Sequence, residues 1–82
     1  MSYHIAIDCP PGSARPDVIL DIVLEGTELV FDDFKITNKF FGEWTFILSE
    51  DKNDIYMKYK QHIGDYLRKL NGMGCVRYAE WS

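Results

Sequence analysis

The fold depends on how one stretch of the chain is interpreted, Val18-Ile19-Leu20-Asp21-Ile22-Val23-Leu24-Glu25. Four of its eight residues are β-branched and its even-numbered positions are all apolar, which is typical of a β-strand with one buried face. Pro16 before it and Gly26 after it would also suit the two ends of a short helix. We favour the strand, because Gly26-Thr27 has the glycine-first order of a two-residue hairpin turn.

Further elements are predicted on both sides of this stretch. The opening segment, residues 3–9, is rich in aromatic and β-branched residues and is stopped by Pro10-Pro11, so it predicts a strand. Later strands are expected at residues 29–37, 43–49 and 75–81. Between the last two, apolar residues recur at helical spacing and predict one long amphipathic helix: Ile55, Tyr56, Tyr59, Ile63, Tyr66, Leu67 and Leu70.

These elements predict one α+β domain over residues 1–82. The favoured order is β-β-β-β-α-β, an antiparallel sheet of four to five strands with one long C-terminal amphipathic helix. If residues 14–25 are helical instead, the order becomes β-α-β-β-α-β, a ferredoxin-like arrangement. Both orders set the last strand beside the first, so Cys9 and Cys75 are expected to lie close together.

Composition limits the class of protein. Eighty-two residues that are 46% hydrophobic can bury one core, and charge interrupts every apolar run well short of the roughly 18 residues that span a bilayer. The first residues lack the pattern of a secretory signal, so we expect a cytoplasmic protein with no membrane contact. Two cysteines do not make a disulfide framework, and together with the two histidines they do not have the spacing of a zinc site. We therefore expect no metal and no cofactor.

The charge is unevenly distributed along the chain. The net charge is -4, and residues 1–50 contain nine acidic residues against three basic ones. Such a surface repels phosphate backbones and attracts basic partners, so we expect a protein partner with a basic surface and no direct contact with nucleic acid.

The predicted hairpin gathers these acids on one face. Pairing through Gly26-Thr27 would set Glu25 opposite Glu28 and Asp21 opposite Asp32. A single helix covers one side of a sheet, so this face would stay exposed, with apolar residues framed by carboxylates. The aromatic turn at Phe40-Phe41 is a second candidate anchor. The predicted partner-binding residues are therefore Asp21, Glu25, Glu28, Asp32, Asp33, Phe40 and Phe41.

These observations favour a non-enzymatic inhibitor that occludes a basic surface of a partner protein, including a surface that binds nucleic acid. In size and charge the chain resembles the small acidic inhibitor proteins of bacteriophages, anti-CRISPR proteins among them. A homo-oligomeric structural module, such as a homodimer, is an alternative.

A different class of function is suggested by Cys9-Pro10-Pro11-Gly12-Ser13-Ala14-Arg15. This spacing of Cys and Arg after a strand resembles the phosphate loop of cysteine-dependent phosphatases, and the resemblance implies that Cys9 is a nucleophile and that Arg15 binds the anion. Pro10 and Pro11 lack the backbone N–H groups that such a loop directs at phosphate. A phosphatase-like enzyme, or an anion-binding protein that uses Cys9 and Arg15, is therefore an alternative to the protein-binding module.

Overall fold

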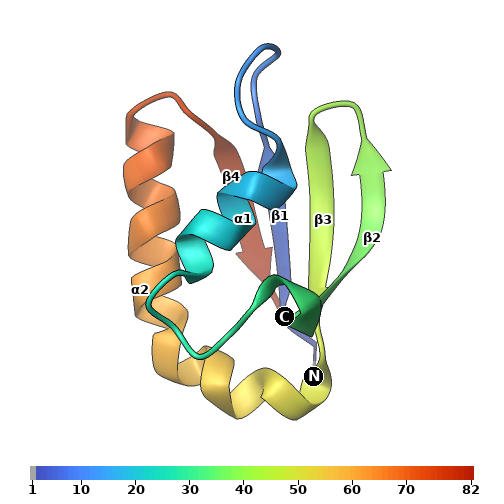
Figure 1. The fold of residues 1–82 in the computed structure, drawn as a ribbon, viewed down its shortest axis with the longest axis vertical. Helices are drawn as coiled ribbons and strands as arrows, with labels where there is room; N and C mark the ends of the chain where they lie inside the picture. Colours follow the sequence, from blue (N-terminus) through green and yellow to red (C-terminus); the bar gives the residue numbers. More distant parts are fainter. Residues whose placement is uncertain (1) are drawn as a thin grey trace.

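The structure is a computed structural model that describes residues 2–82, and these residues form four strands and two α-helices (Figure 1). In chain order the elements are β1 (His4–Asp8), α1 (Pro16–Leu24), β2 (Phe34–Phe40), β3 (Glu43–Leu48), α2 (Asn53–Gly72) and β4 (Arg77–Trp81). Two short 3-10 turns, η1 (Phe31–Asp33) and η2 (Glu50–Lys52), precede β2 and α2. The predicted α+β class, with an antiparallel sheet and a long C-terminal helix, is confirmed.

The strand prediction for residues 18–25 is wrong, because Pro16–Leu24 forms α1. α1 buries five residues, and their spacing places all five on one side of the helix: Pro16, Ile19, Leu20, Val23 and Leu24. Gly26 lies beyond the helix end with φ 81°, a conformation that glycine adopts readily. The chain therefore has the alternative order, β-α-β-β-α-β.

The Gly26-Thr27 hairpin does not form, because its first strand is a helix. Instead, the Thr27 backbone N–H donates to the Leu24 carbonyl at 3.0 Å and continues the turn that ends α1. The chain then runs through an irregular segment to η1, and the strand predicted at residues 29–37 is β2, which begins only at Phe34.

The four strands form one antiparallel sheet in the order β2-β3-β1-β4. In the centre of the sheet Ile5 pairs with Phe46 on one side and with Glu80 on the other. The last strand lies beside the first, as both predicted topologies required. Cys9 follows the end of β1 and Cys75 precedes β4, and both thiols are free.

Both helices pack on the same side of the sheet, and Figure 1 shows α1 crossing in front of it. The core between them contains the largest fully buried side chains, which include Tyr56, Phe46, Ile5, Ile7, Leu20, Ile63 and Leu67. Gly64 of α2 belongs to this packing, since a Cβ at this position would lie 3.3 Å from Glu80 Oε1. Glu80 Oε2 accepts a hydrogen bond from the Tyr56 hydroxyl at 2.9 Å, which joins α2 to β4.

The opposite side of the sheet carries no helix from residues 2–82. Side chains alternate along a strand, so the residues between the buried positions point to this side. We call it the open sheet face, and it consists of His4, Ala6, Asp8, Lys35, Asn38, Phe40, Glu43, Thr45, Ile47, Arg77, Ala79 and Trp81.

Candidate partner-binding surface

The structure does not bring the predicted acidic residues together as a hairpin. Asp21 lies on α1, Glu25 is its C-cap, Glu28 lies in the following segment, and Asp32 and Asp33 belong to η1. The predicted cross-strand pairs of carboxylates therefore do not form.

Two of these acids bind other parts of the chain. Glu28 accepts hydrogen bonds from Lys58 Nζ at 2.9 Å and from the Tyr59 hydroxyl at 2.8 Å, and these donors hold the pKa of Glu28 below its ordinary value. Asp33 accepts from the Val30 backbone N–H at 2.9 Å and lies 3.8 Å from Lys52 Nζ. The segment between α1 and β2 is therefore bound to α2 through Glu28 and to η2 through Asp33.

The other three acids are exposed and form no ion pair with any of residues 2–82: Asp21, Glu25 and Asp32. Asp21 and Glu25 share one side of α1 with Val18 and Ile22, since these positions are three or four residues apart. Val18 is 45% exposed, although it is a large apolar residue on a short helix. Carboxylates and apolar side chains therefore alternate on the outer side of α1.

A shallow groove runs between α1 and η1. Its volume is about 330 Å³, and its lining consists of Asp17, Val18, Asp21, Ile22 and Phe31. Phe31 also packs edge-on against Phe46 of the core, with ring centroids 5.9 Å apart. We call the groove and its surroundings the α1 surface, and it consists of Val18, Asp21, Ile22, Glu25, Val30, Phe31 and Asp32.

Asp17 is the acidic residue of the groove whose charge is already neutralised. Arg15 Nε and Nη2 donate to its two carboxylate oxygens at 3.1 and 2.6 Å, and this hydrogen bonding lowers the pKa of Asp17. The unpaired negative charge of the α1 surface therefore comes from Asp21, Glu25 and Asp32.

The aromatic turn is a separate exposed feature. Phe40 and Phe41 are 62% and 91% exposed, and their rings meet edge to face with centroids 4.5 Å apart. Phe41 also has φ 50°, in the left-handed region that is uncommon for a bulky residue. The extended strand β2, Phe34–Phe40, leads from η1 to this turn, so the turn lies apart from the α1 surface.

Cys9 and Arg15 do not have the geometry of a phosphate loop. Cys9 is 5% exposed, and burial, followed by the charges of Asp8 and Asp17, raises the pKa of its thiol. Arg15 is bound to Asp17, and its guanidinium lies 5.7 Å from the centroid of the Trp44 ring. A nucleophilic cysteine needs the opposite environment, in which the thiolate is stabilised.

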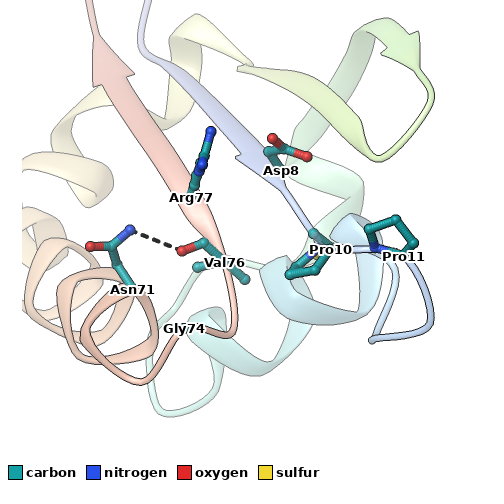
Figure 2. Close-up of a pocket in the computed structure, with 8 residues that line it drawn as sticks. Asp8, Pro10, Pro11, Asn71, Gly74, Val76 and Arg77 are labelled. Atoms are coloured by element: carbon teal, nitrogen blue, oxygen red, sulfur yellow. Dashed lines mark hydrogen bonds between the residues drawn. The ribbon is translucent and has the colours of Figure 1, made fainter.

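A cavity of about 520 Å³ lies where the β1–α1 loop meets the α2–β4 loop (Figure 2). Its lining consists of Asp8, Cys9, Pro10, Pro11, Asn71, Gly74, Val76 and Arg77. The Asn71 side-chain amide donates to the Val76 carbonyl at 2.9 Å and so closes the α2–β4 loop. Sequence reasoning missed this cavity, and the only available signal was that both loops adjoin strands expected to be neighbours.

Two further observations limit the chemistry of the described residues, 2–82. They contain no cluster of three or more His, Cys, Asp or Glu side chains that could hold a metal ion. None of their helices is long and apolar enough to cross a bilayer.

Comparison of the chain with protein-family models, with curated proteins and with solved structures gave no match.

Proposed function

We propose that this protein is a small acidic protein-binding module whose α1 surface covers a basic surface of a partner protein. The observation that supports the proposal best is the groove between α1 and η1, where exposed Val18 and half-buried Ile22 and Phe31 lie beside Asp21, a carboxylate with no counter-ion among residues 2–82. Apolar surface bordered by charge is typical of protein contacts. The contact would form in the cytoplasm, the compartment that the sequence favours.

The two kinds of residue have different roles in such a contact. Val18, Ile22 and Phe31 supply apolar area that binding removes from water. Asp21, Glu25 and Asp32 attract Lys and Arg side chains, which speeds the encounter and selects basic partners. If the partner binds nucleic acid, these carboxylates compete with phosphates for the same cations, and the module acts as an inhibitor.

The phosphatase alternative has less support. The raised pKa of Cys9 and the engagement of Arg15 with Asp17 both oppose the chemistry that the spacing of these residues suggested.

The proposal is tested by affinity capture from a cell extract with the wild-type chain and with the double variant Asp21→Asn/Glu25→Gln as bait, with quantification by mass spectrometry. A specific partner should be basic, and the double variant should bind it about tenfold more weakly, because two attractive charges are lost. Raising the salt concentration from 0.05 to 0.5 M should weaken the wild-type complex as screening increases.

The matched control is Asp51→Asn/Asp54→Asn, which removes the same charge from exposed positions at η2 and the start of α2. This control should capture the partner as the wild type does. Equal recovery by the wild type and Asp21→Asn/Glu25→Gln, or equal losses in both double variants, would contradict the α1 surface as the binding site.

A further inference from the structure

The open sheet face is a second surface, and its composition differs from that of the α1 surface. The strand registers arrange its side chains in rows across the sheet. One end row consists of Lys35, Ile47, His4 and Trp81, and the other consists of Phe40, Glu43, Asp8 and Arg77. We call these the Lys35 row and the Arg77 row, respectively.

The middle row between them contains small side chains. Asn38, Thr45, Ala6 and Ala79 lie side by side in register, so the side chains at the centre of the face are shorter than those at its ends. Larger aromatic groups stand at the ends: Trp81 is 45% exposed and stacks on His4 with ring centroids 5.0 Å apart, and Phe40 is 62% exposed. An open sheet face of this kind can accept another sheet, since sheets pack about 10 Å apart through their side chains.

The charges of this face balance. Lys35 and Arg77 supply two cations, and Asp8 and Glu43 supply two carboxylates. The whole chain carries a net charge of -4, and the α1 surface carries carboxylates without a matching cation. Two copies therefore repel each other through their α1 surfaces but not through their open sheet faces.

The arrangement of the charges is also self-complementary. A two-fold axis that runs across the strands, above the middle row, places the Lys35 row of one copy over the Arg77 row of the other. Each strand then lies over the same strand of the second copy, which sets His4 over its Asp8 and Trp81 over its Arg77. Lys35 lies over Phe40 of the second copy, with Glu43 of that copy on the neighbouring strand. Lys35 and Glu43 carry opposite charges, and Arg77 meets Trp81 in a cation–π interaction, so these contacts are attractive.

We infer that the open sheet face binds the open sheet face of a second copy of this chain and forms a two-fold symmetric dimer. A stable interface buries about 800 Å² per partner. Because the chain exposes 5123 Å² in all, one broad face of the molecule is sufficient. The α1 surface lies on the other side of the sheet, so each dimer presents two copies of it, and the dimer does not depend on the proposed function.

Sedimentation equilibrium over protein concentrations from about 1 µM to 1 mM tests the dimer. The 9.6-kDa chain should approach twice its monomer mass as concentration rises. Ala79→Glu places a charge in the middle row at an exposed position and should give a monomer at concentrations where the wild type dimerises. Gln61→Glu adds the same charge to an exposed position of α2 and should dimerise as the wild type does, with circular dichroism confirming that both variants fold.

Charge exchange tests the predicted pairing. Lys35→Glu and Glu43→Lys should each sediment as monomers, because each creates like charges at the contact, whereas an equimolar mixture should restore a dimer. Asp21→Asn/Glu25→Gln should leave the dimer intact, which separates this result from that of the α1 surface. A wild-type chain that stays monomeric to 1 mM, a dimer that survives Ala79→Glu, or single variants that dimerise like the wild type would overturn the inference.

Discussion

Gly42 occupies a position where the backbone leaves no room for a side chain. The Cys9 N–H donates to the Gly42 carbonyl at 3.0 Å, so the β2–β3 turn touches the residue that follows β1. A Cβ at position 42 would lie 2.5 Å from the Cys9 carbonyl oxygen, which is closer than non-bonded atoms approach. The glycine therefore allows the turn to meet the first strand.

Gly42→Ala should lower the free energy of unfolding by about 1–3 kcal/mol, because backbone atoms must shift to relieve the overlap. Gly72→Ala is the matched control, since no atom lies within 4 Å of a Cβ at that helical position. It should stabilise the protein by about 0.5–1 kcal/mol through helix propensity. Urea unfolding measures both, and a neutral Gly42→Ala would contradict the close approach.

At the level of elements, α1 determines which side chains of residues 18–25 are buried. Val23 is fully buried against the sheet, whereas Val18 on the same helix is 45% exposed. A strand at residues 18–25 would also place these two residues on opposite faces, but it would bury Val18 under the helix and expose Val23.

Val23→Ala should therefore lower the free energy of unfolding by about 2 kcal/mol, from lost burial and the cavity that remains. Val18→Ala removes the same atoms from a surface position and should change it by less than about 0.5 kcal/mol. Chemical denaturation of the two variants provides the comparison. A larger loss for Val18→Ala would contradict the helical orientation.

Elements with one clear periodicity could be predicted from the sequence. In α2 the apolar stripe around Ile63 and Leu67 fits only a helix, and in β3 the buried Trp44, Phe46 and Leu48 alternate as a strand requires. In α1, Asp21 is the sole polar residue between Val18 and Leu24, so the apolar residues match both periods and the β-branched content favoured the wrong one. Packing on the sheet, which the sequence does not display, selects the helix.

The sequence predicts which residues of the candidate site are acidic, but not which of them remain unpaired in the folded chain. That Asp21, Glu25 and Asp32 belong to an acidic part of the chain follows from the sequence. The contacts of Glu28 with Lys58 and of Asp33 with Lys52 do not, because they join segments about 20 to 30 residues apart. Tertiary contacts therefore decide which carboxylates remain available to a partner.

At the scale of the whole molecule, the hydrogen bond from Tyr56 of α2 to Glu80 of β4 makes the free energy of unfolding decrease at alkaline pH. Burial and then the Glu80 carboxylate raise the pKa of the Tyr56 hydroxyl well above its ordinary value. Below about pH 10, Tyr56 is neutral in both the folded and the unfolded chain, and its contribution to stability is complete. Above about pH 10 the unfolded chain releases this proton and the folded chain keeps it, so stability falls as pH rises.

Tyr56→Phe should reduce this alkaline loss, which reaches about 1.4 kcal/mol per pH unit for one tyrosine. At pH 7 the same variant should be less stable than the wild type by about 1–2 kcal/mol, because Glu80 loses its hydrogen-bond donor. Urea unfolding from pH 7 to 11 measures both effects, and an unchanged slope in Tyr56→Phe would contradict the assignment.

The strand order also affects how the chain folds during its synthesis. Of the four strands, β1 is synthesised first. One of the two strands that pair with β1 is β4, residues 77–81, which is synthesised after all the other elements. Pairings between such distant segments form late, because a long loop must close before they contribute. Until β4 has been synthesised, the nascent chain therefore exposes one edge of β1, and this edge can pair with other chains.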